Sequence, residues 1–414
     1  MTSAPHPGDT RGPCPFWLET PSGRTMRTSE TLPARVEVVV IGGGITGVSV
    51  AYWLARAGRQ VLVVERRGIA GGATGRNGGH ISPGTAERFA VACQRYGEEG
   101  ARAIWTFSQR CADEVRAFAA EHRIDCDLRV TGSVSLALTA DELAQVRNTA
   151  EGLARLGVPV ETWDAATCAA RTGSASFLGG VLRGTAGQLW PARLTLGIVE
   201  QAVRLGVAVQ TGTAVRAVER RGGALAVRTD RGEITATHVV HATNAWARQL
   251  LPSLEGVVVP VRGQVIVTEP APPIWSFGLS TNFGYEYWLQ RPDGRIVLGG
   301  MRWLTPTKEV GLDDDSVVEP TVSQGLRAFL PRHFPALAGI RVEREWTGVM
   351  GFTDDRAPLV GPWPGAPGEW VALGFNGHGM PMAFLAGRAI AEMIAGRSAD
   401  TVVPAAFAPA RLLR

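Results

Sequence analysis

Three glycines that follow a strongly apolar segment constrain the fold of this chain more than any other feature. Gly42, Gly44 and Gly47 form the pattern Gly-x-Gly-x-x-Gly directly after residues 36–41, which have the pattern of a buried strand. Residues 45–56 then have a helical pattern that ends before Gly58, and residues 60–65 have the pattern of a second buried strand. Strand, glycine turn, helix and strand in this order predict a βαβ unit that binds a dinucleotide.

Each glycine of this fingerprint has its own physical role. The first permits a tight turn, the second lets the backbone approach a pyrophosphate, and the third lets helix and strand pack closely. Ile45 and Thr46 open the helix, whose unpaired N–H groups face the phosphate charge. Glu65 ends the second strand, where we expect it to accept hydrogen bonds from ribose hydroxyls and to repel the 2′-phosphate of NADP. The fingerprint alone leaves NAD and FAD open.

A second glycine-rich segment follows almost at once. Residues 71–80 contain five glycines in ten positions, so their backbone can lie against a large flat ligand. Within this loop Arg76 and Asn77 are expected to offer hydrogen-bond donors to phosphate or ribityl oxygens.

Charge and cysteine content argue against several other classes. The 42 basic and 38 acidic residues are interleaved, so no basic patch for nucleic acid is expected. Five cysteines without a C-x-x-C pair indicate reduced thiols. Residues 38–55 carry no charge, but three consecutive glycines would break a membrane helix there, and residues 1–15 lack the apolar core of a signal peptide. We therefore expect a cytoplasmic protein without a transmembrane segment.

The rest of the chain alternates helical and strand patterns. Helices are expected over residues 86–121, 140–156, 194–205 and 382–395, and a strand over 132–138. Short strands at 208–210, 215–220, 225–229 and 233–236 suggest a small β-meander inserted in the nucleotide domain. Strands at 257–268, 285–290 and 295–299, the last two joined by a turn at 291–294, suggest an antiparallel sheet in another domain.

With these segments the chain resembles the D-amino-acid oxidase-like (DAO) family of FAD-dependent oxidoreductases, in particular its gamma-glutamylputrescine oxidoreductase and sarcosine oxidase-like branch. The resemblance spans nearly the whole chain from about residue 35. It rests on five motifs in family order: V-V-V-I-G-G-G-I-T-G at 38–47, G-A-T-G-R-N-G-G at 72–79, H-A-T-N-A-W at 241–246, G-F-T-D-D-R-A-P-L-V-G at 351–361 and G-F-N-G-H-G-M at 374–380.

This resemblance implies an α/β (α+β) two-domain architecture. A Rossmann-like FAD-binding domain would be built from the discontinuous segments 35–90, 190–250 and 345–414. A substrate domain with a mostly antiparallel sheet would contain residues 91–189 and 251–344. Residues 1–34, which contain six prolines, are expected to form an arm laid over the surface or partly mobile.

The resemblance also implies where FAD would lie. Val215 would meet the adenine region through its backbone, residues 242–244 would pass near the ribityl chain or phosphates, and residues 377–380 would reach the pyrimidine edge of the flavin. A helix N-terminus there would stabilise the negative charge that develops on reduction. The complete expected FAD-binding set is Gly42, Gly44, Ile45, Thr46, Gly47, Glu65, Arg66, Arg67, Gly72, Ala73, Thr74, Arg76, Asn77, Gly78, Gly79, His80, Val215, Ala242, Thr243, Asn244, Trp246, Gly348, Gly351, Asp355, Gly377, His378, Gly379 and Met380.

Noncovalent FAD is expected. Relatives with a covalent flavin attach it through a late cysteine or a histidine of the early loop. Here the last cysteine is Cys168, and Arg76 stands at the position that matches the loop histidine. His80 is the remaining alternative for covalent attachment.

The residues that hold a substrate carboxylate in relatives have no cationic counterpart here. Positions that match the clamps of sarcosine oxidase-like relatives carry Gly79, Ser82 and Pro381, and the clamp position of glycine oxidase-like relatives carries Met350. Because a buried carboxylate without a cation costs several kcal/mol, the expected substrate is an amine without an adjacent carboxylate.

Two features bear on what else the substrate pocket contains. Arg302 could supply a different clamp, which leaves amino acids, including D-amino acids, N-methyl amino acids and imino acids, as the alternative substrates. Tyr285, Tyr287 and Trp288 lie on a strand that faces the flavin in relatives, so they either line an aromatic pocket or simply pack the sheet.

The implied reaction is hydride transfer from the carbon next to a neutral amine nitrogen to flavin N5, followed by hydrolysis of the imine to a carbonyl compound. An alkyl amine of pKa about 10 must first lose a proton, which an apolar pocket promotes by desolvation. His80, His378 and Glu286 are the candidate proton acceptors.

The electron acceptor is either dioxygen or another molecule. Sarcosine oxidase-like relatives activate dioxygen with a lysine above the ring, and the single lysine, Lys308, lies in an expected surface loop. The following residues, Asp313, Asp314 and Asp315, are expected to form a solvated turn and not a metal site, because adjacent carboxylates cannot all point at one ion.

Three competing interpretations remain. A nicotinamide-dependent dehydrogenase would use the same βαβ unit but leaves the motif at 374–380 without a role. A nonenzymatic FAD-binding protein is the second alternative. Membrane association through the electron acceptor is the third.

Overall fold

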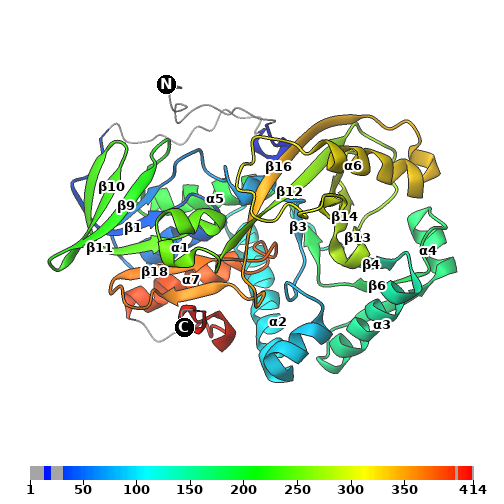
Figure 1. Cartoon of the computed structure of the whole chain (residues 1–414), viewed down its shortest axis with the longest axis horizontal. Coiled ribbons are helices and arrows are strands. Elements are labelled where there is room, and N and C mark those ends of the chain that lie inside the picture. The colour runs from blue at the N-terminus through cyan, green and yellow to red at the C-terminus, as the bar shows by residue number, and fades with distance from the viewer. Residues whose placement is uncertain (1–13, 20–30, 397–399, 413–414) are drawn as a thin grey trace.

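The structure is a computed structural model that describes residues 14–19, 31–396 and 400–412. Two eight-stranded sheets lie at opposite ends of the molecule, and helices pack around each of them (Figure 1). This is the mixed α/β, two-domain architecture that the sequence predicts, although the boundaries proposed for the two domains stay a prediction. Among the described residues, no helix combines the length and the apolar character needed to span a bilayer.

The first sheet has the order β17-β18-β11-β1-β2-β8, with β1 near its centre. β1 pairs in parallel with both β2 and β11, as a βαβ unit requires. A hairpin of β9 and β10 is attached to the first half of β11. The strands are β1 (Arg35–Ile41), β2 (Val61–Val64), β8 (Ala208–Gln210), β9 (Val215–Arg221), β10 (Ala224–Thr229), β11 (Gly232–His241), β17 (Leu359–Pro362) and β18 (Glu369–Leu373).

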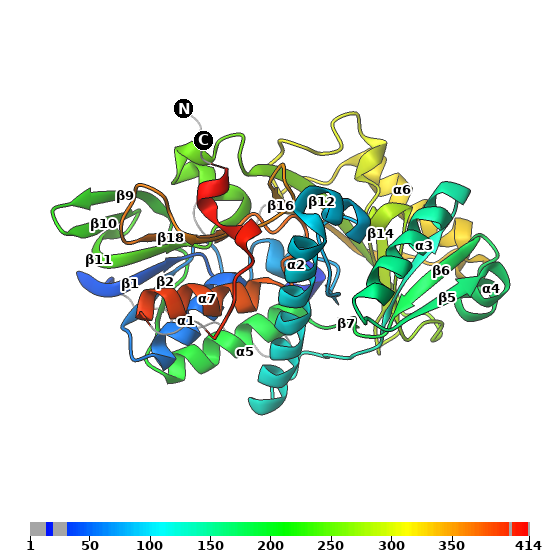
Figure 2. The ribbon, with the colours of Figure 1, turned by 90° about the horizontal axis from the view of Figure 1, so that it is seen from below.

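Both faces of β1 are buried, which explains its run of apolar residues. Val38 and Val40 belong to the core beneath the helices, whereas Val39 and Ile41 belong to the core beneath the β9–β10 hairpin. Figure 2 shows the helices on one side of this sheet and the hairpin on the other. These helices are α1 (Ile45–Arg56), α5 (Pro191–Arg204) and α7 (Ala383–Ala395).

The second sheet has the order β16-β12-β15-β14-β13-β4-β6-β5. Its pairs are antiparallel except for β13 and β4, which run parallel. Its strands are β4 (Ser133–Ala137), β5 (Val160–Asp164), β6 (Gly179–Arg183), β12 (Val259–Thr268), β13 (Gly278–Thr281), β14 (Glu286–Gln290), β15 (Ile296–Gly299) and β16 (Val342–Phe352). The elements beside it are β3 (His80–Ile81), β7 (Gly187–Gln188), α2 (Phe89–Glu121), α3 (Ala140–Arg155), α4 (Ala165–Thr172) and α6 (Pro320–His333).

The two faces of the second sheet differ in character. Val134, Leu279 and Trp288 alternate onto one face, where they form a core with α6. Ser133 and Tyr287 lie on the opposite face, which borders the large cavity described below. The pleat of the strands therefore separates a packing face from a cavity face.

Two expectations about the first sheet and its surroundings need correction. The predicted four-stranded meander has three strands, β9, β10 and the first half of β11, because residues 208–210 instead form an edge strand of the main sheet and β11 continues to His241 beside β1. The predicted helix over 86–121 begins at Phe89 and is kinked at Gly97, whose φ is +73°. Both errors arise because pairing partners and kinks depend on contacts that are distant in sequence.

The described part of the N-terminal arm is anchored. Phe16 and Trp17 are buried, and Trp17 donates a hydrogen bond from Nε1 to the Asn77 carbonyl oxygen at 2.6 Å. Trp190 in turn donates to the carbonyl oxygen of Trp17 at 2.6 Å. This short segment is therefore part of the core, contrary to the expectation of a surface arm; residues 1–13 and 20–30 lie outside the described residues.

Candidate active site

A cavity of about 1030 Å³ is lined by the ends of strands from the first sheet and by one face of the second. It brings together most of the residues that the sequence predicts for the site. Those that line it are Gly42, Gly44, Ile45, Thr46, Glu65, Arg66, Arg67, Gly72, Ala73, Thr74, Arg76, Asn77, Gly78, His80, Val215, Ala242, Thr243, Asn244, Trp246, Tyr285, Tyr287, Arg302, Gly348, Gly377, His378, Gly379 and Met380.

Three predicted glycines do not line the cavity but shape the backbone behind it. A Cβ on Gly47 would overlap the carbonyl oxygen of Gly42, which is the close packing that the fingerprint requires. A Cβ on Gly79 would lie 2.8 Å from the Trp17 ring, and φ at Gly79 is +78°. Gly351 likewise has no room for a side chain beside Asn244.

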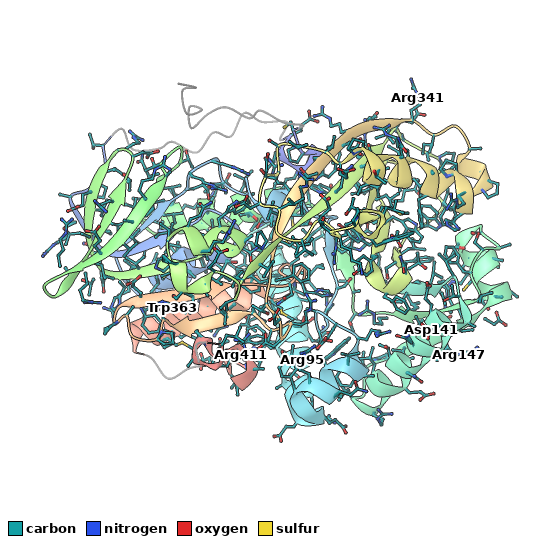
Figure 3. All side chains as sticks on the ribbon, viewed as in Figure 1. Arg95, Asp141, Arg147, Arg341, Trp363 and Arg411 are labelled. Atoms are coloured by element: carbon teal, nitrogen blue, oxygen red, sulfur yellow. The ribbon has the colours of Figure 1, made fainter. Side chains whose placement is uncertain are left out.

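Asp355, another predicted FAD-binding residue, lies away from the cavity. Its carboxylate pairs with Arg411, with Nε at 2.6 Å from Oδ2, close to the C-terminal segment in which Figure 3 labels Arg411. Burial works to raise the pKa of Asp355, but the hydrogen bonds from Arg411 prevail and lower it. The geometry assigns Asp355 to fastening the C-terminal segment, which differs from the expected cofactor contact.

The turn between β1 and α1 forms an anion-binding end of the cavity. Gly42 has φ +115°, and a Cβ there would lie 2.6 Å from the carbonyl oxygen of Ala242. Helix α1 begins at Ile45, and its N-cap, Gly44, supplies no side-chain cap. Ile45 N donates to Thr74 Oγ1 at 3.2 Å, and Gly44 and Thr46 line the cavity beside it. The positive end of the helix dipole therefore faces the cavity, as binding of a pyrophosphate requires.

Glu65 lies beside this turn at the end of β2. Its Oε2 accepts a hydrogen bond from Gly43 N at 2.6 Å, and its Oε1 accepts one from Arg67 N at 2.7 Å. The two backbone donors hold the carboxylate at the cavity wall. The predicted hydrogen bonds from ribose hydroxyls to this carboxylate stay a prediction.

The two arginines after Glu65 are used differently from each other. Arg66 lies over the Trp246 ring, with its Cζ 4.3 Å from the ring centroid. Arg67 forms an ion pair with Asp315, with Nη1–Oδ2 at 2.7 Å. Asp315 is only 4% exposed, so the expected solvated turn of three aspartates is wrong at this position.

The expected side-chain donors of the early glycine loop, Arg76 and Asn77, are used within the protein. Arg76 donates to the carbonyl oxygens of Gly71 at 3.0 Å and Thr347 at 2.8 Å, and Asn77 donates to that of Thr74 at 2.8 Å. The expected role of these two side chains as phosphate or ribityl donors therefore differs from what the structure shows. The hydrogen bonds from Arg76 and Asn77 hold the loop in its conformation, and the backbone of the loop faces the cavity.

The late glycine loop is held by two asparagines. Asn376 is buried, accepts a hydrogen bond from Thr353 N at 2.8 Å and donates to the carbonyl oxygen of Gly374 at 2.6 Å. Asn244 accepts a hydrogen bond from Gly374 N at 3.0 Å. Residues 377–380 line the cavity, and α7 begins three residues later at Ala383. The positioning role of Asn376 was missed from the sequence, although its place inside the G-F-N-G-H-G-M motif marks it.

Tyr287 dominates the cavity face of the second sheet. Its ring lies perpendicular to that of His80, with 5.9 Å between the ring centroids. A Cβ on Gly78 would lie 2.5 Å from the Tyr287 ring, and one on Gly299 would overlap it. Burial raises the pKa of Tyr287 to about 12 and lowers that of His80 to about 4, so both groups are uncharged at neutral pH.

Two neighbours of Tyr287 point the other way. Trp288 is fully buried in the core with Phe329 and Phe334, so of the two alternatives it packs the sheet and does not line the pocket. Glu286 accepts hydrogen bonds from Trp303 Nε1 at 2.6 Å and Met301 N at 3.3 Å on the same side of the strand. The alternation of the strand therefore excludes Glu286 as a proton acceptor for a group in the cavity.

Arg302 lines the cavity beyond Tyr287. Its Cζ lies 4.7 Å from the centroid of the Tyr285 ring, and Nη1 donates to the carbonyl oxygen of Lys308 at 3.1 Å. No carboxylate of the described residues lies within ion-pair distance of it. Lys308 itself is exposed on the surface loop, as expected, so no lysine lines the cavity.

Arg183 at the end of β6 also lines the cavity and was missed from the sequence. Residues 179–183 had no strand prediction, so nothing indicated which way this arginine would point. Like Arg302, Arg183 lines the cavity without a carboxylate partner among the described residues.

The residues present fit FAD. The glycine turn at one end supplies bare backbone to a pyrophosphate, and Glu65 lies where a ribose would follow. The same cavity continues past Val215 and the early loop to residues 377–380 and Tyr287, so an extended dinucleotide with a flat ring system has space along its length. The sulfur atoms of the five cysteines form no disulfide.

Comparisons with known proteins agree with this site. A family model described as DAO, FAD dependent oxidoreductase, matches residues 37–393. The probable oxidoreductase OrdL of Rhizobium meliloti is 29% identical over 88% of this chain and 84% of that protein. Gamma-glutamylputrescine oxidoreductase of Escherichia coli K12 is 30% identical over 87% of this chain and 84% of that protein. Glycine oxidase of Pseudomonas aeruginosa is 29% identical over 90% of this chain and 98% of that protein.

Solved structures show the same fold. Glycine oxidase from Geobacillus kaustophilus matches with a TM-score of 0.78 and 20% identity, covering 91% of this chain and 98% of that chain. L-proline dehydrogenase from P. horikoshii matches with a TM-score of 0.77 and 23% identity, covering 92% of this chain and 98% of that chain. Because the family model spans most of the chain, this protein belongs to the DAO family of FAD-dependent oxidoreductases, which act on amine or amino-acid donors.

Proposed function

We propose that the protein oxidises the C–N bond of an amine whose reacting carbon bears no carboxylate. One observation carries this proposal: Ser82, Met350 and Pro381, which match clamp positions of relatives, line the cavity without a positive charge. A carboxylate buried at these positions would lack a cation and would cost several kcal/mol. An uncharged substituent there carries no such cost.

When bound, FAD would supply the redox chemistry, as the acceptor of a hydride from the carbon next to a neutral amine nitrogen; hydrolysis of the resulting imine would give a carbonyl compound and ammonia or an amine. The protein must therefore bind the amine, favour its neutral form and receive one proton. The aromatic wall at Tyr285 and Tyr287 favours the neutral form, because desolvation lowers the pKa of an amine.

His80 and His378 are the two groups that can hold that proton. Both line the cavity, and burial lowers the pKa of each, so each is neutral at pH 7 and able to accept. Nε2 of His80 has no hydrogen-bond partner among the described residues, whereas Nδ1 of His378 lies 3.4 Å from the carbonyl oxygen of Asn376. We therefore favour His80 over His378 as the acceptor.

A second candidate function is oxidation of an amino acid, and Arg302 supports it. Its guanidinium lines the cavity without a carboxylate partner among the described residues, and stacking on Tyr285 holds it in place. A planar guanidinium can bind a substrate carboxylate through two parallel hydrogen bonds.

The test is a screen of anaerobic flavin reduction with polyamines, N-methyl amines and D- and L-amino acids, for the wild type and Arg302→Ala. We expect amines to bleach the flavin absorbance near 450 nm fastest, with little change in the variant. Fastest reduction by an amino acid, lost in Arg302→Ala, would replace the first proposal by the second. Failure of every amine and amino acid would contradict both.

The reduced cofactor must pass its electrons to dioxygen or to another acceptor. Because the single lysine is exposed outside the cavity, we propose that an acceptor other than dioxygen is used. Oxygen uptake during turnover, compared with the reduction of an electron-accepting dye, tests this: turnover with oxygen as fast as with the dye would overturn it.

A further inference from the structure

Glu286 is a buried carboxylate on β14 that the proposed reaction does not use. It is only 2% exposed and does not line the cavity, because its side chain lies on the opposite face of the strand from that of Tyr287. Oε1 accepts hydrogen bonds from Trp303 Nε1 at 2.6 Å and from Met301 N at 3.3 Å, and the Asn282 side chain also donates to this carboxylate. No cation of the described residues lies within ion-pair distance of it.

Two adjacent loops supply these three donors. Residues 282–285, which connect β13 to β14, supply one donor, and residues 300–304, which follow β15, supply two. We call these segments the first and the second rim loop. A Cβ on Gly300 would overlap the carbonyl oxygen of Tyr285, so the backbones of the two loops are in direct contact. One carboxylate therefore fastens both loops.

Each rim loop places a side chain at the cavity. Phe283 of the first rim loop lines the cavity although it is 48% exposed, and Arg88, which is also exposed, lies over its ring with Cζ 5.0 Å from the centroid. Arg302 of the second rim loop lines the cavity and lies over the rings of Tyr285 and Phe352. Because Phe283 and Arg88 both line the cavity and both reach solvent, the two loops border its entrance.

Both rim loops contain large residues in the left-handed backbone region. φ is +48° at Asn282, +57° at Phe283 and +61° at Met301. Side chains of this size rarely adopt such a conformation, and it persists only where the surrounding contacts fix it. Glu286 supplies contacts of this kind to one loop through Asn282 and to the other through Met301. Loss of the carboxylate should therefore let both loops relax.

We propose that Glu286 is a positioning residue, which holds the two rim loops together and thereby sets how tightly the substrate is bound at the cavity entrance. It acts through the backbone of the loops and does not touch the substrate. Tyr287 is placed separately, by its pairing with Gly299 and its contact with His80, so the reacting end should change little. The kinetic part of this inference rests on the proposed function, and it holds for an amine and an amino acid alike.

Four variants separate the acceptor oxygen from other effects of the substitution. Glu286→Met keeps the chain length and removes both oxygens, whereas Glu286→Gln keeps one oxygen to accept from Trp303 and Met301. Trp303→Phe removes one donor of the second rim loop. The control is Glu269→Gln, because Glu269 accepts a hydrogen bond from Arg341 N at 3.0 Å and neither residue lines the cavity. Figure 3 labels Arg341 at the periphery of the molecule.

Amide hydrogen exchange of the holoenzyme without substrate tests whether one carboxylate holds both loops. In Glu286→Met we expect exchange in both rim loops to be at least about tenfold faster, because each loop loses a buried hydrogen bond. In Trp303→Phe it should rise in the second rim loop alone, since Asn282 still donates to Glu286. Glu286→Gln and Glu269→Gln should stay within about threefold of the wild type in both loops.

Anaerobic flavin reduction tests the effect on substrate binding. The probes are the polyamines, N-methyl amines and amino acids of the screen above that reduce the wild-type flavin. Glu286→Met should raise their apparent dissociation constant about tenfold and leave the limiting rate of reduction within about threefold. Glu286→Gln should restore the affinity. The effects of Glu286→Met and Trp303→Phe should not add in the double variant, because both remove the same hydrogen bond.

Both single-site routes keep the test open if one variant folds poorly. Glu286→Met replaces a buried carboxylate by an apolar side chain of similar length, which folded proteins often tolerate, and Trp303 is 43% exposed, so Trp303→Phe removes little core packing. Trp303→Phe by itself should speed exchange in the second rim loop and weaken substrate binding in the same direction as Glu286→Met.

The outcomes distinguish this inference from the proposed function. Unchanged exchange in either rim loop of Glu286→Met, a loss of affinity that Glu286→Gln does not restore, or an equal loss in Glu269→Gln would overturn the role of Glu286 and leave the proposed function standing. If no amine or amino acid reduces the flavin of the wild type, the proposed function fails, and hydrogen exchange still decides whether Glu286 holds both loops.

Discussion

The Arg67 guanidinium and the Asp315 carboxylate form a two-pronged ion pair, in which Nη1–Oδ2 is 2.7 Å and Nη2–Oδ1 is 2.8 Å. Arg67 follows β2 of the first sheet, whereas Asp315 belongs to the segment that precedes α6 of the second. Asp315 also lies 3.3 Å from Nε of Arg76 in the early loop. A single carboxylate thus joins the cavity wall after β2 and in the early loop to the segment that precedes α6.

Asp315→Asn should destabilise the protein and weaken FAD retention. The substitution leaves Arg67 and Arg76 without their counter-charge, which costs about 3 kcal/mol, at the low end for a buried pair because Arg67 stays partly exposed. Urea unfolding of the holoenzyme and the rate of flavin release measure the two effects. Asp314→Asn, at the exposed neighbouring position, is the control. Equal losses in the two variants would argue against the ion pair as the cause.

Trp17→Ala should destabilise the fold, because it removes the side chain that anchors the early glycine loop. Trp17 is fully buried, and its Nε1 bonds the carbonyl oxygen of Asn77, so the change removes a large core side chain and a hydrogen bond at a cost of about 3–5 kcal/mol. Trp17→Phe, which keeps most of the ring but not the donor, should cost about 1–2 kcal/mol. Thermal unfolding of both variants provides the measurement, and an unchanged melting temperature in Trp17→Ala would contradict the anchoring of this segment.

His80 should make the stability of the fold depend on pH. Its pKa in the folded protein is about 4, below the value of about 6.5 expected for the unfolded chain, so between these values only the unfolded state binds the proton. Stability should therefore be full above pH 6.5 and fall by about 2–3 kcal/mol as the pH drops to 4. Urea unfolding from pH 4 to 8 measures this for the wild type and His80→Gln.

The comparison with His80→Gln isolates this histidine. Burial also lowers the pKa values of His238, His333 and His378. These three histidines remain in the variant, so they contribute equally to each curve. The free energy of unfolding of the wild type, minus that of His80→Gln, should decrease as the pH drops below 6.5. Parallel curves across the whole range would show that His80 titrates alike in the folded and unfolded states.

Gly299→Ala should disturb the cavity wall without replacing a titratable group. The added Cβ would overlap the ring and hydroxyl of Tyr287, so the tyrosine must move out of its position beside His80. A misplacement of this size should slow flavin reduction by about 10- to 100-fold. Gly223→Ala, where nothing lies within 4 Å of the new Cβ, is the matched control in the β9–β10 hairpin. Stopped-flow rates of flavin reduction in the two variants test whether the position of Tyr287 matters for the reaction. A rate equal to that of the wild type in Gly299→Ala would rule out the proposed role of Tyr287.

The predictable part of the site is the part that is local in sequence. The turn at Gly42 to Gly47 lies between one strand and one helix, and Glu65 ends the next strand. The positions of these residues therefore follow from elements that are consecutive in the sequence. The same holds for residues 377–380, which a glycine-rich motif marks by itself. Helix α1 accordingly has the bounds that its pattern predicts, Ile45–Arg56.

The errors concern residues whose partners come from distant segments. The composition of residues 313–315 indicates a solvated turn, but Asp315 meets Arg67, which lies 248 positions earlier. Asp355 similarly pairs with Arg411 and does not line the cavity. Side-chain charge is visible in a sequence, whereas the opposite charge that neutralises it becomes visible only after the chain has folded.

By itself the amino-acid sequence determined the nucleotide-binding unit, the family and the cofactor, because glycine turns, strand patterns and motif order are properties of short segments. Only the tertiary structure decided which side chains face the cavity. Tyr287 faces it while Glu286 and Trp288 do not, because neighbouring residues of a strand point to opposite faces. Arg183 became part of the site for the same reason: β6 pairs beside β4 in the second sheet, and that pairing turns the guanidinium toward the cavity with no carboxylate of the described residues to neutralise it.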